Sequence, residues 1–334
     1  MKAVFIRQHG DPSIIEVGDM PDPKPADGEV LVRVRAASIN RLDLYTRAGI
    51  RGTKQAASAF PRILGGDSAG DIVEIGSGVE GRTIGQRVVI NPLLTTDPFP
   101  KMIGTHVQGS YAEFVVVPAG NVVPIADSLS YVQAASLPTV FLPTWSIIVR
   151  EGQLKKYETA MVLSASSGVG TAAIQIIKGV IGANCIAVTS TPEKIQKALE
   201  LGADHSINYK TEDLAERVRE ITEGRGVDLI VDSTGALFFE AAYASLGRGG
   251  RFGTCGVTSG YLSQIHLGQL FSKELKLFGV FMGSTNELGQ IAEAAGKGEL
   301  KGAIHRELSL DQVADAHQEM ERSDHFGKFV VTVD

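Results

Sequence analysis

The chain has 334 residues, and its 32 Lys and Arg against 38 Asp and Glu give a formal net charge of −6 at pH 7. Because a single domain usually has about 150 residues, this length predicts two domains, each large enough to bury a core. The negative charge argues against nucleic acid as a partner, since a phosphate backbone needs a basic face. The longest apolar stretch, around residues 174–188, is interrupted by Lys178 and Asn184. We therefore expect no transmembrane helix and no membrane partner.

Cysteine is nearly absent, because Cys185 and Cys255 are the only two and lie far apart in the sequence. Two such residues build neither a disulfide framework nor a Cys-based zinc site. The apolar segment near the N-terminus, residues 3–6, is too short for the core of a secretory signal. A reducing, cytoplasmic location is the simplest expectation.

The first part of the chain, residues 1–126, consists of short strand-like runs separated by glycine-rich turns. Apolar or alternating runs occur at residues 30–34, 72–75, 88–90 and 112–117, which is typical of strands. This part therefore predicts an all-β domain of short strands, consistent with a partly open barrel.

From residue 127 onward, strand patterns alternate with amphipathic helices. The expected strands cover residues 160–163, 185–188, 229–231 and 251–254. The first expected helix covers residues 169–181. A second helix follows its cap residue Thr191, with Pro192 at its first position, and a third begins at Thr211. This alternation predicts a doubly wound parallel sheet. Near the C-terminus, Val313, Ala316 and Met320 share one helical face, and residues 329–333 form a last strand.

The first strand of this α/β part runs directly into Ser-Ala-Ser-Ser-Gly-Val-Gly at residues 164–170. Glycines permit a tight turn and a close approach to a pyrophosphate, which then lies against N–H groups at a helix N-terminus. The first glycine of the usual G-x-G-x-x-G is missing, but the strand before and the helix after are the expected context. We therefore expect Ser167, Gly168, Val169 and Gly170 to bind a dinucleotide; a plain strand-to-helix turn is the alternative.

The end of the second predicted strand indicates the type of cofactor. An NAD-specific site places Asp or Glu there to bind the ribose hydroxyls, whereas this chain has Thr189, Ser190 and Thr191, with Lys194 one turn into the next helix. Hydroxyls, a helix N-terminus and a lysine favour a 2′-phosphate. NADPH is therefore the expected cofactor, although Lys194 as a solvated helix residue is the alternative.

Several segments, in order along nearly the whole chain, resemble the medium-chain dehydrogenase/reductase superfamily and its zinc-free NADPH:quinone oxidoreductase branch. They are residues 1–3, 40–45, 64–70, 109–114, 166–170, 202–205 and 327–330. The resemblance implies a GroES-like β domain for the substrate, made of residues 1–126 and 285–334. It also implies a Rossmann doubly wound parallel-sheet domain for NADPH, made of residues 127–284.

The chain departs from the zinc-dependent members of this family at the positions that carry their ligands. Where those members have a cysteine, this chain has Asn40, and where they have a His-Glu pair, it has Gly66 and Asp67. The region of their structural zinc lobe, residues 92–106, contains no cysteine. We therefore expect no metal.

The resemblance also implies roles for individual residues. Asn40 and Tyr45 would line the nicotinamide and substrate pocket as catalytic residues, although a turn asparagine and a core tyrosine are the ordinary interpretations. The remaining cofactor contacts would be Thr144 at the nicotinamide, Ser190, Lys194 and Tyr209 at the 2′-phosphate, Ser233, Thr234 and Gly235 after the fourth strand, Phe281, Met282 and Gly283 beside the nicotinamide, and Lys328 in the 327–330 segment. We expect His317 to pack inside the protein.

The predicted reaction is hydride transfer from NADPH to a quinone or a similar conjugated carbonyl acceptor. Without zinc, no Lewis acid polarises an isolated carbonyl, whereas a conjugated acceptor spreads the incoming charge. One alternative is an enoyl-thioester or activated-alkene reductase, whose basic entrance would use Arg41, Arg47, Arg51 and Lys54. Another is a non-catalytic NADPH-binding structural or sensor protein. We also expect a homodimer or homotetramer, with residues 275–282 as an intersubunit edge strand.

Overall fold

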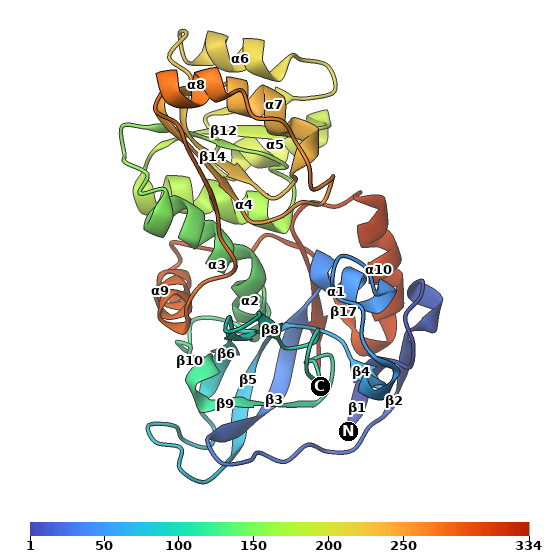
Figure 1. Cartoon of the computed structure of the whole chain (residues 1–334). Helices are drawn as coiled ribbons and strands as arrows, with labels where there is room; N and C mark the ends of the chain where they lie inside the picture. The colour runs from blue at the N-terminus through green and yellow to red at the C-terminus, as the bar shows by residue number, and fades with distance from the viewer. Residues whose placement is uncertain (334) are drawn as a thin grey trace. The chain divides into compact units, whose positions relative to one another are not determined.

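The computed structural model describes residues 1–333, and the chain divides into two compact units. Unit 1 comprises Met1–Thr139 together with the chain from Ser284 onward, and unit 2 comprises Val140–Gly283 (Figure 1). We expected the boundaries after residues 126 and 284. The first boundary lies later because helix α2 (Tyr131–Ala135) packs against strands of unit 1. In the described part of the chain, no helix is long and apolar enough to cross a membrane.

Unit 1 is built around a seven-stranded sheet with the order β10-β6-β5-β3-β18-β17, in which β9 also pairs with β3. These strands are β3 (Glu29–Ser38), β5 (Asp67–Ile75), β6 (Arg87–Ile90), β9 (Phe114–Pro118), β10 (Val122–Pro124), β17 (Ile304–Ser309) and β18 (Lys328–Thr332). A three-stranded sheet joins β1 (Lys2–Ile6), β2 (Glu16–Asp19) and β4 (Arg62–Ile63), and a hairpin joins β7 (Leu93–Thr95) and β8 (Lys101–Met102). Val30, Val32 and Val34 of β3 enter the main core, as the alternating pattern predicts.

The first part of the chain is not all-β as expected, because helix α1 (Arg41–Ala48) follows β3. Asn40 is its N-cap residue, Asp43 lies in its first turn and Gly49 ends it with a φ of 69°. The helix is short and largely polar, so only Leu44 gives it an apolar face in the core. Unit 1 also contains the α-helices α2, α9 (Thr285–Gly296) and α10 (Val313–Arg322), along with short 3-10 helices.

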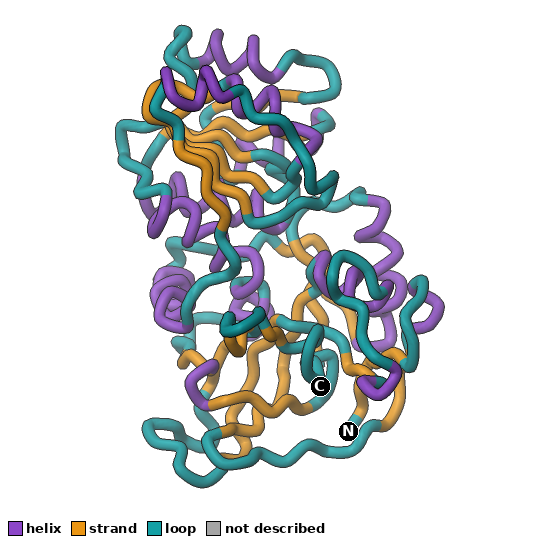
Figure 2. The backbone as a smooth tube through the Cα atoms, in the orientation of Figure 1, coloured by secondary structure: helices purple, strands orange, loops and turns teal. Residues whose placement is uncertain are grey.

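Unit 2 is a six-stranded parallel sheet with the order β13-β12-β11-β14-β15-β16, which confirms the predicted doubly wound architecture (Figure 2). Its strands are β11 (Thr159–Val162), β12 (Asn184–Thr189), β13 (His205–Asn208), β14 (Val227–Asp232), β15 (Leu246–Thr254) and β16 (Lys276–Gly279). Its helices are α3 (Pro138–Trp145, which begins in unit 1), α4 (Gly168–Gln175), α5 (Pro192–Glu200), α6 (Leu214–Ile221), α7 (Ala236–Ala244) and α8 (Leu267–Ser272).

In unit 2, the N-cap residues determine where helices α5 and α6 begin. Thr191 caps α5 and accepts a hydrogen bond from the Lys194 N–H, as predicted. Helix α6 begins after Asp213 and not at Thr211, because the Asp213 carboxylate accepts the hydrogen bond of the Glu216 N–H. Thr211 instead closes a turn onto the carbonyl of Asn208. The short edge strand β13 was not predicted, since its sequence His-Ser-Ile-Asn has only one apolar residue.

Candidate active site

The loop after β11 has the form of a dinucleotide-binding turn. Ser164 adopts a φ of 53°, a left-handed conformation that few residues other than glycine take. Ser167 is the N-cap of α4, and its Oγ accepts a 3.0 Å hydrogen bond from the Gly170 N–H. A side chain at residue 170 would place its Cβ 2.4 Å from the carbonyl oxygen of Ser164, so only glycine fits there. Gly168 and Val169 come directly after Ser167 and lie in the first turn of α4.

Ser190 and Tyr209 follow the carboxyl ends of two neighbouring strands, and Lys194 lies in the helix after the first of them. Thr189 at the end of β12 pairs with Asn208 at the end of β13, so Ser190 and Tyr209 leave the sheet side by side. The Tyr209 ring packs edge-on against Phe238, with 4.7 Å between ring centroids. Lys194 lies in the first turn of α5. The end of β12 carries no carboxylate, as the sequence indicated.

The end of β14 is organised by Asp232, which sequence reasoning missed. Its carboxylate accepts hydrogen bonds from the N–H groups of Thr234 (2.7 Å) and Gly235 (3.1 Å) and from the Thr254 hydroxyl (3.1 Å). Burial raises the pKa of Asp232, and these hydrogen bonds oppose the rise. The carboxylate thereby fixes the loop that contains Ser233 and Thr234. A polar residue that ends a buried strand was the available signal in the sequence.

Two hydroxyl groups at this sheet edge are buried without a hydrogen-bond partner: Thr189 Oγ1 and Thr234 Oγ1. Such groups are rare in proteins because each costs about 1–3 kcal/mol when it is unsatisfied. Thr189 is the last residue of β12 and Thr234 follows β14, and these two strands flank β11 in the sheet. A bound dinucleotide rich in oxygen atoms fits these orphan donors, so the residues present fit a nicotinamide cofactor.

The residues expected beside the nicotinamide occupy different environments in unit 2. Phe281 is 53% exposed, whereas Met282 is buried and adopts a φ of 56°. The Met282 carbonyl accepts a 2.9 Å hydrogen bond from the Ser146 hydroxyl, and Gly283 ends the unit. Thr144 is fully buried, and its hydroxyl donates to the Val140 carbonyl within α3 at 2.5 Å. Contact of these residues with a nicotinamide stays a prediction.

In unit 1, a buried polar cluster surrounds the Asp67 carboxylate. Asp67 begins β5 opposite Ser38, the last residue of β3. The carboxylate accepts hydrogen bonds from Ser38 Oγ (3.1 Å), Asn40 Nδ2 (2.8 Å) and Thr139 Oγ1 (2.6 Å). The Thr139 N–H adds a further bond of 3.1 Å. Asp67 and Ser38 are fully buried, so these donors replace the water that a carboxylate would otherwise bind.

Lys328 supplies the positive charge of this cluster. It begins β18, and two residues later Val330 pairs with Ser38. The ammonium lies 2.5 Å from Asn40 Oδ1 and 3.4 Å from Asp67 Oδ2. Lys328 is only 3% exposed, and this burial lowers its pKa although the neighbouring carboxylates oppose the change. The structure thus brings together Asn40 and Lys328, which we had assigned to different roles.

A second carboxylate, Asp43, holds the N-terminus of α1. It accepts a 2.7 Å hydrogen bond from the Asn40 N–H and one of 2.8 Å from the Tyr111 hydroxyl. Burial raises the pKa of Asp43 to about 7, while these two hydrogen bonds lower it. Burial and the Asp43 charge also hold the pKa of Tyr111 well above its usual value. Asp43, Asp67 and Tyr111 all lie in the segments that carry the resemblance, but the sequence does not show that they meet.

Tyr45 lies apart from this cluster, in the last turn of α1. Its ring is half-buried and carries the Arg51 guanidinium 5.0 Å from its centroid. The hydroxyl of Tyr45 makes no hydrogen bond within residues 1–333. It is therefore available as a donor to a ligand.

The expected basic entrance does not form as one surface. Arg47 is buried and donates to Glu321 at 2.5 Å and to the Gly10 carbonyl at 3.1 Å. Arg41 instead contacts the Ser323 hydroxyl. His317 packs in the interior as expected, and burial together with Arg47 lowers its pKa to about 3.

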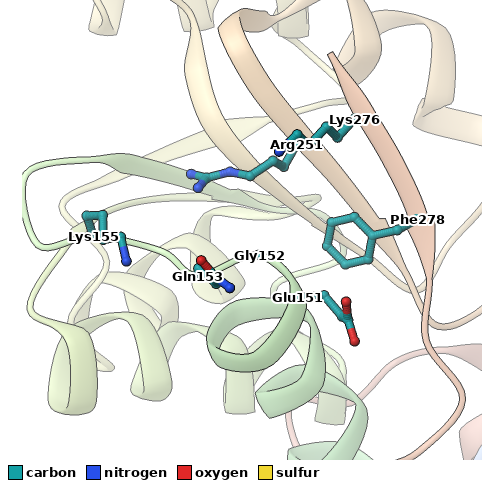
Figure 3. Close-up of a pocket in the computed structure, with 7 residues that line it drawn as sticks. All are labelled: Glu151, Gly152, Gln153, Lys155, Arg251, Lys276 and Phe278. Atoms are coloured by element: carbon teal, nitrogen blue, oxygen red, sulfur yellow. The ribbon is translucent and has the colours of Figure 1, made fainter. Parts of the chain in front are cut away.

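A small pocket of unit 2 contains none of the predicted site residues. It has a volume of about 190 Å³, below the range of about 300–1,000 Å³ that ligand pockets usually have. Its lining residues are Glu151, Gly152, Gln153, Lys155, Arg251, Lys276 and Phe278 (Figure 3). Lys276 is the first residue of β16, so the pocket lies away from the carboxyl edge of the sheet. Ligands of open parallel sheets bind at the carboxyl edge.

Comparison with known proteins gives two matching families. Residues 26–127 match the family described as Alcohol dehydrogenase GroES-like domain, and residues 168–296 match the family described as Zinc-binding dehydrogenase. An NAD-dependent alcohol dehydrogenase of Sulfolobus acidocaldarius is 31% identical, and the alignment covers 100% of both chains. A quinone oxidoreductase of Salmonella typhimurium is 31% identical over 81% of this chain and 77% of its own length.

Solved structures match the whole chain. The crystal structure of an NAD-dependent alcohol dehydrogenase has a TM-score of 0.94 at 36% identity and covers 100% of both chains. Escherichia coli quinone oxidoreductase complexed with NADPH has a TM-score of 0.86 at 27% identity, also with 100% of both chains covered. These matches confirm the predicted combination of a GroES-like domain and a Rossmann-like parallel-sheet domain.

Because one matching family is described as zinc-binding, we compared the side chains at the expected ligand positions with those that zinc requires. Zinc takes Cys, His and carboxylate ligands, whereas Asn40 offers an amide, Gly66 offers no side chain and Asp67 already holds Lys328. An ammonium 2.5 Å from Asn40 Oδ1 repels a second cation at the same place. Within the described residues, no group of three or more His, Cys, Asp and Glu side chains could hold a metal ion. These residues do not fit zinc.

Proposed function

Since the chain belongs to the medium-chain dehydrogenase/reductase superfamily, we propose that this oxidoreductase transfers hydride from NADPH to a quinone or a similar conjugated carbonyl acceptor without zinc. The observation that carries the proposal is the contact between Lys328, Asn40 and Asp67 in place of a metal donor set. Two unpaired cysteines, Cys185 and Cys255, are compatible with a reducing, cytoplasmic setting.

The choice of acceptor follows from the residues at Asn40, Gly66 and Asp67, which do not fit a Lewis-acid metal. An isolated ketone develops full alkoxide charge during hydride transfer, and a metal ion is the usual means of stabilising it. A quinone or an enone spreads the same charge over its π system, so a hydrogen-bond donor is sufficient. Tyr45 has a free hydroxyl that can serve as such a donor.

The preference for NADPH over NADH is proposed from the end of β12. Thr189, Ser190 and Thr191 offer hydroxyl groups there, and Lys194 offers a positive charge in the first turn of α5. A carboxylate at this place would repel a 2′-phosphate, and none is present at the strand end. Relatives named NAD-dependent exist alongside a relative solved with NADPH, and titration with both cofactors tests the preference.

In the mechanism, this chain positions the reactants and excludes water. The cofactor, when bound, supplies the hydride. Ser167 and the N–H groups at the start of α4 would hold its pyrophosphate, while Asp232 keeps the Ser233–Thr234 loop in place. Tyr45 would orient the acceptor by a hydrogen bond to its oxygen, and water would supply the proton that completes the reduction.

The proposed function is tested by the purified chain with a panel of acceptors. We expect NADPH oxidation with quinones and enones, little with simple ketones, and little NAD⁺ reduction with primary or secondary alcohols. Preferential turnover of enoyl thioesters would identify the alternative reductase. Tight NADPH binding without turnover of any acceptor would identify a non-catalytic binding protein. Efficient alcohol oxidation with NAD⁺ would contradict the proposal.

We also propose that the protein is a homodimer or homotetramer. Strand β16 forms an open edge of the parallel sheet, at residues within the segment expected to join subunits. Large apolar side chains are exposed in the same unit, among them Leu262, Leu267 and Phe271. An open strand edge and exposed apolar groups favour association with another copy. Light scattering of the purified protein tests this proposal, and a monomer at micromolar concentration would contradict it.

A further inference from the structure

The side-chain donors of the polar cluster in unit 1 are nearly all used by its two carboxylates. The hydroxyls of Ser38 and Thr139 donate to Asp67, and the hydroxyl of Tyr111 donates to Asp43. A hydroxyl has one hydrogen to donate. These three residues therefore have no donor left for a ligand.

The Asn40 amide is also occupied, and its orientation is determined by its neighbours. Oδ1 faces the Lys328 ammonium at 2.5 Å, while Nδ2 donates to Asp67 at 2.8 Å and faces the Ser38 carbonyl at 3.5 Å. A rotated amide would place two donors against each other at Lys328 and two acceptors against each other at Asp67. Asn40 therefore acts within the cluster and has little capacity left to bind a substrate oxygen, contrary to the role that the resemblance implies.

Lys328 is the member of the cluster that keeps an unused donor. An ammonium has three N–H groups, and Lys328 has two acceptors in the structure, of which the 3.4 Å contact with Asp67 is long. Asp67, Ser38 and Tyr111 are fully buried, whereas Thr139 is partly exposed, Asn40 keeps 7% of its surface and Lys328 keeps 3%. Because the Thr139 hydroxyl already donates to Asp67, a ligand oxygen that reaches the cluster finds the unused donor at Lys328.

We propose that Lys328 is a catalytic residue, whose remaining N–H binds the oxygen of the acceptor and stabilises the negative charge that develops there. This inference rests on the proposed function. In the step, the hydride leaves with the electron pair of its C–H bond in the reduced cofactor, so NADPH is oxidised to NADP⁺, and forms a new C–H bond with an acceptor carbon. The acceptor is reduced: one of its π bonds breaks, and the negative charge moves to the oxygen. Lys328 keeps its proton throughout, and a proton from water then neutralises the oxyanion.

The cluster is built for this task in three respects. The cation is fixed by Asn40 and Asp67, so no reorganisation is needed when charge develops. Its surroundings are buried, which strengthens the interaction relative to water. The Asp67 carboxylate balances the charge before the ligand binds, and Asp67 is itself satisfied by Ser38, Asn40 and Thr139.

The experiment compares three variants with the wild type. K328M removes the ammonium and keeps an unbranched side chain, and K328M/D67N also removes the carboxylate that K328M would leave unpaired in the interior. K24M removes an exposed lysine of unit 1 and is the matched control. For each protein, the NADPH dissociation constant is measured by fluorescence titration, and the hydride-transfer rate is measured in single turnovers at saturating NADPH with a quinone.

We expect both Lys328 variants to transfer hydride about 100-fold more slowly at saturating NADPH, the usual effect of losing one oxyanion donor. Their NADPH dissociation constants should stay within about threefold of the wild type, and K24M should match the wild type in both quantities. Weaker NADPH binding with an unchanged saturated rate would contradict the inference, because it would make Lys328 a cofactor anchor. An unchanged rate and an unchanged dissociation constant would contradict it as well.

A second measurement does not depend on turnover. p-Nitrophenol changes its absorbance when it ionises, so it reports its own pKa when it binds to the protein with NADP⁺. We expect the bound phenol to have a lower pKa on the wild type than on K328M/D67N, because a nearby ammonium favours the phenolate. No binding, or an equal pKa on both proteins, would contradict the inference. A lowered pKa on a wild type that reduces no acceptor would refute the proposed function and leave the site at Lys328 standing.

Discussion

The hydroxyl of Tyr111 donates a 2.8 Å hydrogen bond to Oδ2 of Asp43, and the same oxygen accepts the Asn40 N–H. Asp43 thereby joins a core residue to the first turn of α1, and it fixes the backbone from which Asn40 reaches Asp67. Both side chains are buried, so the bond belongs to the interior of unit 1.

The stability of the protein should depend on pH through Asp43. Burial raises the pKa of Asp43 from 3.8 to about 7 in the folded protein. Between these values the folded state binds a proton that the unfolded state has lost, so stability falls as pH rises from about 4 to 7. D43N should remove this contribution, which is on the order of a few kcal/mol. Urea unfolding of both proteins across this pH range tests it, and parallel stability curves would contradict it.

A related variant, Y111F, tests the cause of the shift. The Tyr111 hydrogen bond lowers the pKa of Asp43 against the larger effect of burial. Its removal should therefore raise the pKa further and extend the pH range over which stability falls. If the stability of Y111F instead levels off at lower pH than that of the wild type, the assignment of this hydrogen bond is wrong.

We expect any side chain at residue 65 to destabilise the protein, because the Tyr111 ring occupies the space it would need. Its φ is 94°, and a Cβ there would lie 2.2 Å from the Tyr111 ring. We expect G65A to lose more than about 3 kcal/mol, because overpacking adds to the cost of the left-handed backbone. Gly78 is the matched control, since its φ is 72° with nothing within 4 Å, and G78A should lose about 1 kcal/mol. Equal losses in thermal or urea unfolding would contradict the packing argument.

The proposed NADPH preference makes a prediction at α5. K194M should weaken NADPH binding about tenfold and leave NADH binding nearly unchanged, because the phosphate contact is lost. K197M, one turn later on the same helix, is the control and should change neither affinity. Fluorescence titrations with both cofactors provide the measurement. Equal weakening of NADH and NADPH by K194M would show that Lys194 does not recognise the 2′-phosphate.

The parallel sheet of unit 2 could be predicted because its signals are local. The apolar run that forms β11, the Ser-Gly-Val-Gly turn and the Thr191 cap each lie within a few residues of the element they specify. Helix α1 was missed for the opposite reason. It has eight residues and few apolar ones, and it is held by Asp43, whose partner Tyr111 lies far along the chain.

The site in unit 1 could be predicted only in part. Asn40 could be singled out because it occupies a position where zinc-dependent relatives have a ligand. Its buried partner Lys328 could not be identified as a partner from the sequence. Lys328 reaches Asn40 because β18 pairs with β3 beside β5, and this pairing joins residues from opposite ends of the chain. No local pattern records such a contact, so the cation of the cluster became visible only in the fold.

The central claim is hydride transfer to a conjugated acceptor without a metal ion. Its most direct test is the rate of NADPH oxidation with a quinone after exhaustive chelation, with the metal content of the same sample measured by mass spectrometry. The proposal predicts an unchanged rate in protein that contains far less than one metal ion per chain. A rate that disappears on chelation and returns when zinc is added would contradict it.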